Sequence, residues 1–310
     1  MKEVSAFAPA TIANVGVGFD ILGFSVTGAG DTIHLKKNLN HRNAIIKNIL
    51  GTPAIPTQSQ KNTASVTLQK LIDDKKLEYG FDIILEKGIP LSSGLGGSAA
   101  SAVAAVVAGN ALLEPERKLT NNEMIYYALE GEYVASESRH ADNIAPSLMG
   151  GLCLVSSLNP INIVNIPQAK IWVSIINPKM QLETKSARAI LSKEVTLNLY
   201  IKQSMLLSSF ICANYENNLE LLKNSFQDLI IEPQRKKMIP CFDIVKEKVL
   251  ENNALGFTIA GAGPTVFALS ETENKARDLT ELMKKTFHDN KVEVNLSITS
   301  PFINKGAFTL

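Results

Sequence analysis

The residues most suited to chemistry form a glycine-rich stretch at positions 88–108, GIPLSSGLGGSAASAVAAVVA. An apolar segment at 81–85 precedes it, and no Gly or Pro interrupts the run of Ala, Val and Ser from 98 to Gly109, so we expect strand, turn and helix in succession. Glycines let the backbone approach a ligand closely. A helix N-terminus offers unpaired N–H groups and the positive end of its dipole to a phosphate. The stretch therefore predicts a phosphate-binding turn.

Two other interpretations of this stretch are a Walker-type loop and a simple packing turn. A Walker-type loop does not match, because no Lys follows the glycines. A glycine turn that only packs a buried helix would have the same composition, and this stretch alone leaves that alternative open.

Two further glycine-rich turns lie far from the first. The block from Ala8 to Gly23 reads APATIANVGVGFDILG and could project Asn14 and Asp20 into a cleft, although such clusters are also common in plain turns. The segment Gly261-Ala262-Gly263-Pro264 follows an expected strand at 256–260.

A second polar stretch follows an expected helix at 121–136. Glu132 lies near the end of that helix, and His140-Ala141-Asp142-Asn143 comes eight residues later. This spacing could place a metal-binding carboxylate beside polar substrate contacts. The alternatives are a solvated carboxylate for Glu132 and a structural role for His140.

The elements that must position these residues are strands and helices in both halves, without regular alternation, which is typical of two α+β domains. We expect a hairpin over residues 24–36 that turns at 28–31, a helix from Asn62 or Thr63 to about 76, and a long helix at about 198–225. The loop around Pro160 is the expected boundary between domains 1–160 and 161–310.

Composition narrows the class of protein. The 310 residues are 45% hydrophobic and 20% charged, which suits a globular protein with sizeable cores. A net charge of +1 gives no indication of a nucleic-acid partner. Cys153, Cys212 and Cys241 have neither disulfide-framework nor metal-site spacing. With no signal-peptide core and no apolar run of membrane-spanning length, we expect a cytoplasmic protein that binds no membrane.

Taken together, the three glycine-rich turns resemble the motifs of the GHMP kinases, the superfamily of galactokinase, homoserine kinase, mevalonate kinase and phosphomevalonate kinase. Further blocks follow in the order typical of the superfamily, and the resemblance spans nearly the whole chain. It is closest to the homoserine kinase branch. The matching blocks are 8–23, 90–100, 140–143, 186–191, 232–235 and 261–268. One difference stands out, because the family usually has two serines where this chain has Gly97-Ser98.

The resemblance implies a two-domain α+β fold. Residues 1–160 would form an ATP-binding domain like domain 2 of ribosomal protein S5, with a left-handed βαβ crossover, and residues 161–310 a ferredoxin-like domain. It also implies phosphorylation of L-homoserine by ATP with Mg²⁺, a step toward threonine, in a possible homodimer.

The resemblance also assigns site residues. Catalytic roles fall to Asn143, Asp20 and Glu132, and the metal ligands would be Ser98 and Glu132. An Asn at the place of the catalytic Asp of mevalonate kinase-like members favours direct attack by the substrate hydroxyl. The nucleotide contacts would be Asn62, Pro90, Leu91, Ser92, Ser93, Gly94, Leu95, Gly96, Gly97, Ser98, Ala99 and Ala100. The substrate contacts would be Asn14, Asp20, His140, Asn143, Arg188, Arg235 and Gly263.

Other function classes were considered. A mevalonate-type GHMP kinase would share these motifs. The segment 94–99 also fits the G-x-G-x-x-A pattern of dinucleotide-binding oxidoreductases, with Glu114 or Glu116 as the acidic residue, but this leaves the other two glycine turns unexplained. A non-catalytic binding protein, for RNA for example, fits poorly with near-neutral charge.

Overall fold

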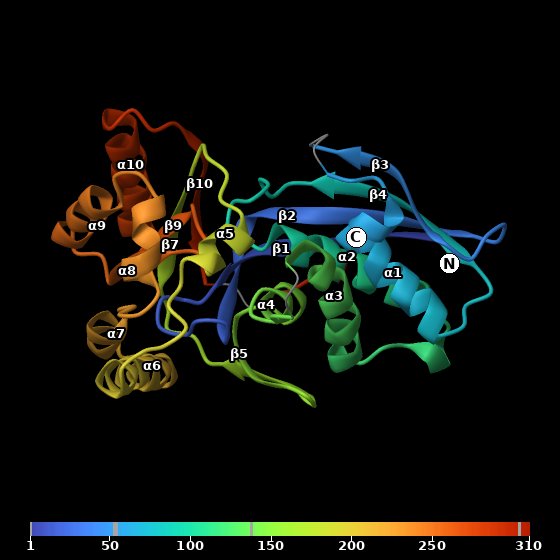
Figure 1. Ribbon diagram of the computed structural model, residues 1–310, viewed down its shortest axis with the longest axis horizontal. Coiled ribbons are helices and arrows are strands. Elements are labelled where there is room, and N and C mark those ends of the chain that lie inside the picture. Colours follow the sequence, from blue (N-terminus) through green and yellow to red (C-terminus); the bar gives the residue numbers. More distant parts are fainter. Residues whose placement is uncertain (1, 52–54, 137–138, 303–304) are drawn as a thin grey trace.

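The computed structural model describes the whole chain except residues 1, 52–54, 137–138 and 303–304. Within that part, one sheet has seven strands in the order β11-β1-β2-β4-β3, with β5 paired to β2 and β6 to β5 (Figure 1). All pairs are antiparallel except β3 with β4. The strands are β1 Glu3–Ala13, β2 Leu22–Asn38, β3 Ala44–Leu50, β4 Gly80–Lys87, β5 Leu152–Leu158, β6 Ile161–Ile166 and β11 Phe308–Thr309.

Helices pack against this sheet, and most residues of α2 are buried, in keeping with its many small and apolar side chains. A Cβ on Gly109 of α2 would lie 2.8 Å from a methyl of Leu68 on α1, so this glycine permits the close approach of the two helices. Asn62 caps α1 by accepting the Ala64 N–H at 3.1 Å, as expected. The elements are η1 Ser59–Lys61, α1 Thr63–Asp74, α2 Gly97–Leu112, η2 Pro115–Arg117, α3 Asn121–Ser136 and α4 Ile144–Met149.

The second sheet has the order β10-β7-β9-β8, and α9 and α10 pack against it in the βαββαβ arrangement of ferredoxin-like units (Figure 1). The predicted α+β class with two units is confirmed. The strands are β7 Trp172–Pro178, β8 Gly256–Ile259, β9 Val266–Ser270 and β10 Val294–Pro301. The helices are α5 Thr184–Ala189, α6 Leu197–Glu216, α7 Leu219–Ser225, α8 Glu232–Arg235, η3 Lys236–Met238, α9 Phe242–Glu251 and α10 Glu273–Asp289.

The two sheets are joined by a shared apolar core. Phe24 of β2 meets Phe267 of β9 edge to face, with ring centroids 5.8 Å apart, and Phe226 contacts Phe267 at the same distance. The strand β6, just after Pro160, pairs with β5 in the first sheet, and β11 returns to β1. The division of the chain at residue 160 stays a prediction.

The expected hairpin at residues 24–36 is wrong. β2 runs without a turn from Leu22 to Asn38, with an irregularity in its pairing opposite Pro9 and Thr11. A Cβ on Gly30 would lie 2.1 Å from the ring of Phe7, so this glycine makes room for an aromatic side chain on β1. Gly28 has φ +94°, which bends the strand locally.

The long helix expected at 198–225 is two helices. Asn217 ends α6 in the left-handed conformation with φ 52°. Asn218 then caps α7 by accepting the Leu221 N–H at 3.0 Å. Two consecutive asparagines therefore end one helix and begin the next, because Asn tolerates positive φ and is a good N-cap.

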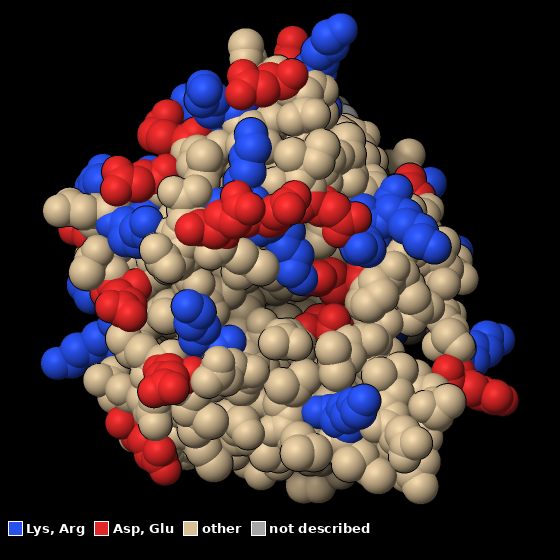
Figure 2. Space-filling model, turned by 90° about the vertical axis from the view of Figure 1, so that its left-hand side faces the viewer, with Lys and Arg blue, Asp and Glu red and all other residues tan. Residues whose placement is uncertain are grey.

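On the face in Figure 2, basic side chains lie in separate groups and form no continuous basic surface, and a row of acidic side chains crosses the middle. The lower part of that face, where α6 and α7 lie, has few charged side chains. Within the described part of the chain, every helix is too short or too polar to span a bilayer.

Candidate active site

The three glycine-rich turns predicted from the sequence meet at one cavity of about 550 Å³ between the two sheets. The first and third turns are joined by the Gly261 N–H, which donates to the Ala13 carbonyl at 3.2 Å, and by the Asn14 amide, which donates to the Gly261 carbonyl at 2.8 Å. The second and third are joined by the Thr265 N–H, which donates to the Ser93 carbonyl at 3.2 Å. The turns therefore position one another across long sequence distances.

Most of the predicted site residues line this cavity. They are Asn14, Asp20, Asn62, residues 90–94 and 96–98, Glu132, His140, Asn143, Arg188 and Arg235. Leu95, Ala99 and Ala100 instead have fully buried side chains in the core behind the turn. Gly263 lies behind Gly94, where a Cβ would come within 2.8 Å of the Gly263 carbonyl oxygen.

The phosphate-type turn ends at Gly96, which has φ 66° and precedes α2. In the described part of the chain no side chain caps the N-terminus of α2, which suits a helix end that receives an anion. A Cβ on Gly96 would lie 2.2 Å from Thr11 Oγ1 and 2.7 Å from Asn143 Oδ1. Glycine is thus required here by the packing of the protein itself.

Ser98 and Glu132 form an oxygen pair on facing helices. The Ser98 hydroxyl donates to Glu132 Oε1 at 3.0 Å. Burial raises the pKa of the Glu132 carboxyl to about 7, against the effects of the Ser98 hydrogen bond and the Lys87 charge. Hydroxyl and carboxylate oxygens suit Mg²⁺, which usually takes few protein ligands and completes its shell with water and phosphate. Within the described residues, no cluster of three or more His, Cys, Asp or Glu side chains could hold a metal ion.

Asp20 is at the centre of a charged group on the opposite wall. Arg188 donates to both carboxylate oxygens, at 3.0 and 2.7 Å, in a forked pair. His140 Nδ1 lies 3.7 Å from Asp20 Oδ2. Burial lowers the pKa of the His140 imidazole, with Asp20 opposing and Arg188 adding to the shift, which favours the neutral ring.

Arg235 lies beside this group but is far more enclosed. It is 2% exposed and donates to the Ala187 carbonyl at 3.1 Å and the Gly261 carbonyl at 2.9 Å. Burial and the nearby Arg188 lower its pKa to about 10, so the guanidinium stays charged at neutral pH. Both guanidinium carbons lie 5.3 Å from the centroid of the Phe19 ring, which keeps two like charges on one aromatic surface.

Asn143 and Asp142 lie between the two walls. The Asn143 amide oxygen accepts a hydrogen bond from Thr11 Oγ1 at 2.8 Å. Asp142 is 4% exposed and lines the cavity, and burial, followed by repulsion from Asp20 and Glu132, raises its pKa to about 7. Sequence reasoning gave Asp142 no role, because adjacency to Asn143 does not show which way its side chain points.

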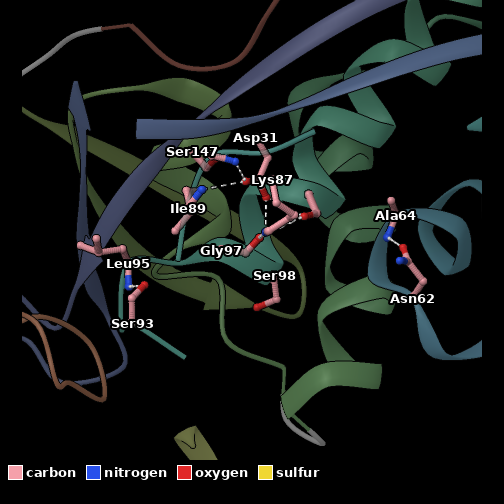
Figure 3. Close-up of polar contacts among 12 residues, drawn as sticks. Asp31, Asn62, Ala64, Lys87, Ile89, Ser93, Leu95, Gly97, Ser98 and Ser147 are labelled. Atoms are coloured by element: carbon pink, nitrogen blue, oxygen red, sulfur yellow. Dashed lines mark hydrogen bonds and ion pairs between the residues drawn. The ribbon is translucent and has the colours of Figure 1, made fainter. Parts of the chain in front are cut away.

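Sequence reasoning also missed Lys87 and Asp31. A Walker-type loop has its Lys after the glycines, whereas Lys87 ends β4 ten residues before Gly97 and lies under the turn (Figure 3). Asp31 was placed in a hairpin turn, but it is fully buried and pairs with Lys87. The only signal in the sequence was a charged residue at the end of an apolar strand.

Comparisons with known proteins agree with this architecture. Residues 62–151 match the family model for the GHMP kinases N terminal domain, and residues 210–289 match that for the GHMP kinases C terminal. A homoserine kinase of Chloroherpeton thalassium is 37% identical over 298 residues, which cover 93% of this chain and 93% of that protein. One of Xylella fastidiosa strain 9a5c is 39% identical over 310 residues, covering 98% and 93%.

Solved structures give the same result. The crystal structure of homoserine kinase from Cytophaga hutchinsonii has a TM-score of 0.95 and 38% identity, and the match covers 100% of this chain and 98% of that one. L. major mevalonate kinase in complex with R-mevalonate has a TM-score of 0.73 at 16% identity, over 97% of this chain and 96% of that one, a likeness of fold alone.

Proposed function

The chain belongs to the GHMP kinases, and within them to the homoserine kinases, and from this membership we propose how its cavity transfers a phosphoryl group from ATP to L-homoserine. The products are ADP and O-phospho-L-homoserine. The observation that supports the substrate assignment is the Asp20–Arg188 pair, with Arg235 alongside, because it offers both signs of charge beside the phosphate-type turn.

ATP would bind along the turn at residues 90–98. The N-terminus of α2, which begins after Gly96 without a side-chain cap, and the backbone N–H groups of the turn suit the phosphates. Asn62, together with Ile55 and Pro56, lines a part of the cavity with a mixed polar and apolar surface that suits a nucleotide base. Phosphoryl transfer depends mostly on positioning and charge neutralisation, and this wall supplies both.

Ser98 and Glu132 would hold Mg²⁺, which neutralises phosphate charge when bound. Their oxygens are 3.0 Å apart, and burial raises the pKa of the Glu132 carboxyl to about 7. The turn at residues 90–98 would also keep the phosphates in line with the acceptor hydroxyl.

Homoserine carries an ammonium and a carboxylate, and the Asp20–Arg188 pair is complementary to both. We infer that the ammonium binds Asp20 and the carboxylate binds Arg188 and Arg235, so the substrate separates a pair that is closed without it. A zwitterion restores a charged contact to each member of the pair. Mevalonate or a simple hydroxy acid would leave the Asp20 carboxylate without a cation.

Asn143 would orient the acceptor hydroxyl, since an amide accepts no proton usefully at neutral pH. The hydroxyl oxygen attacks the γ-phosphorus while the bond to the ADP oxygen breaks, and the hydroxyl proton passes to the transferred phosphoryl group or to water. His140 and Asn14 support the substrate wall, since Asn14 Oδ1 accepts the Asp20 N–H at 3.1 Å.

The setting of the reaction is also a proposal. We place it in the cytoplasm, in the route to threonine, with no membrane or nucleic-acid partner. A homodimer is supported by apolar side chains on the surface of α6, where Leu197 is 71%, Tyr200 59% and Met205 64% exposed.

An ADP-release assay with L-homoserine, mevalonate, galactose and shikimate tests the proposal. We expect turnover with L-homoserine and little with the other three. Faster turnover with mevalonate would overturn the substrate assignment, and no ADP release with any acceptor would overturn the kinase assignment itself.

A further inference from the structure

A buried ion pair lies beside the phosphate-type turn, and the proposed reaction gives neither of its members a role, although the Lys87 side chain also lines the cavity. Asp31 of β2 and Lys87 of β4 are direct cross-strand neighbours. Their side chains are 0% and 3% exposed, and the Lys87 ammonium contacts the Asp31 carboxylate. Buried charges are costly unless they are paired and hydrogen-bonded. The hydrogen bonds of this pair therefore identify the segments of the chain that it positions.

Asp31 fixes the position of the residues that follow β4 and lead into the turn. Its Oδ1 accepts the Gly88 N–H at 3.2 Å and the Ile89 N–H at 3.3 Å. Its Oδ2 accepts the Ser101 hydroxyl at 2.6 Å in addition to the ammonium. One carboxylate thus holds two backbone groups before the turn and a side chain of α2 after it.

Lys87 forms hydrogen bonds with the first residues of α2. Its ammonium donates to the Gly97 carbonyl at 2.7 Å and to Ser101 Oγ at 3.0 Å, and its third contact is Asp31 (Figure 3). Since an ammonium has three N–H donors, all of them are engaged within the protein. Lys87 therefore acts on the start of α2 through the Gly97 carbonyl, and its side chain also lines the cavity beside the turn.

The contacts enclose the whole turn. Residues 88 and 89 lie on one side, residues 97 and 101 on the other, and the segment between them is the proposed nucleotide-phosphate site. Ser98, whose hydroxyl meets Glu132, directly follows the tethered Gly97 carbonyl (Figure 3). We propose that Asp31 and Lys87 are positioning residues that fix the ends of the phosphate turn and the start of α2 for nucleotide binding, an inference that rests on the proposed function.

The glycine at residue 97 is consistent with the positioning role of Lys87. A Cβ at residue 97 would lie 3.3 Å from Lys87 Nζ and 3.3 Å from a methyl of Ile89, which is a tight contact on both sides. The absence of the family's usual serine at this position leaves room for the ammonium to reach the backbone directly.

A purely structural pair is the competing interpretation, and variants can separate the two. Removing one charge alone leaves the other buried without its partner, so single variants report mostly on folding. The double variant Asp31→Asn/Lys87→Met removes both charges, keeps similar shapes and leaves an amide oxygen for the Gly88 and Ile89 N–H groups. It lacks the Lys87 hydrogen bond to the Gly97 carbonyl, which keeps only the Ser101 hydroxyl at 3.1 Å.

The measurements are ADP affinity by calorimetry without added metal, the KM for ATP and for homoserine, and the thermal unfolding midpoint. We expect the double variant to unfold near the wild-type temperature and to bind ADP about tenfold or more weakly, with the KM for ATP raised and that for homoserine unchanged. Lys179→Met, which breaks an exposed pair with Glu293 in the second unit, is the control and should change none of these values.

The outcomes are distinct. A folded double variant with wild-type ADP affinity and ATP KM would overturn the positioning role. If the double variant does not fold, Ser101→Ala decides, because it keeps both charges and removes one hydroxyl from the cluster. Unchanged ADP affinity in that variant would overturn the proposal, and a two- to tenfold loss, of the order of one hydrogen bond, would support it. Failure of the wild-type protein to bind ADP would instead overturn the proposed function.

Discussion

Removing the guanidinium of Arg188 is the most direct test of the substrate wall. Arg188 makes two charged hydrogen bonds to Asp20 and is 38% exposed at its side chain, so its loss should leave the fold intact. A charged hydrogen bond contributes about 1.5–3 kcal/mol, which corresponds to a factor of about 10 to 100 in binding. In Arg188→Ala the substrate no longer has to separate the Asp20–Arg188 pair, which offsets part of the loss. We therefore expect the KM for homoserine to rise about tenfold, near the lower limit.

The assay is steady-state ADP release with homoserine and ATP varied separately. The KM for ATP should change little, and Arg188→Lys should restore only part of the homoserine affinity because an ammonium cannot make the forked contact. A second substrate, 4-hydroxybutyrate, lacks the ammonium and should be a poor acceptor for the wild-type protein because it leaves Asp20 without a cation.

Arg235→Ala is a contrasting variant. It should also raise the homoserine KM, but it leaves the Ala187 and Gly261 carbonyls without their donor and so should lower the free energy of unfolding by about 1–3 kcal/mol. An unchanged homoserine KM in both alanine variants, or equal turnover of homoserine and 4-hydroxybutyrate, would refute the reasoning about the substrate, while the kinase assignment could stand.

Three further predictions concern the rest of the cavity. Glu132→Gln should lower turnover by at least about 10²-fold at limiting Mg²⁺ with the fold retained, and near-normal turnover would remove Glu132 from the metal site. Gly96→Val should weaken ATP binding measured by calorimetry and also lower the unfolding midpoint, because its Cβ would meet Thr11 and Asn143; unchanged values of both would contradict the model of the turn. The Asp142 carboxyl has its pKa raised from 3.8 to about 7, so the folded protein holds a proton that the unfolded chain releases, and stability should fall as pH rises from about 4 to about 7. Asp142→Asn should reduce that fall in the unfolding midpoint, and an identical pH profile would show that Asp142 is not its source.

Local features were predictable from the sequence where short-range rules apply. The cap at Asn62 and the strand and glycine turn before α2 depend on neighbouring residues only. The prediction of a hairpin turn at 28–31 was wrong, because a glycine-rich segment that forms a turn and one that packs under an aromatic ring have the same composition. Similarly, only the structure shows that Asn217 and Asn218 divide one apolar periodic segment into two helices.

By itself, the sequence determined the membership of a family, the order of its three glycine turns and most of the residues that line the cavity, because those residues lie in short contiguous motifs. Only the tertiary structure decided which charges face each other. Arg188 meets Asp20 across 168 positions, and Lys87 meets Asp31 across 56. Asp142 acquires a pKa near 7 only when folding buries it close to two other carboxylates. Pairing and burial depend on long-range contacts that composition and local spacing do not encode. An aspartate in the same local sequence can be a solvated surface charge in one fold and the partner of a buried lysine in another.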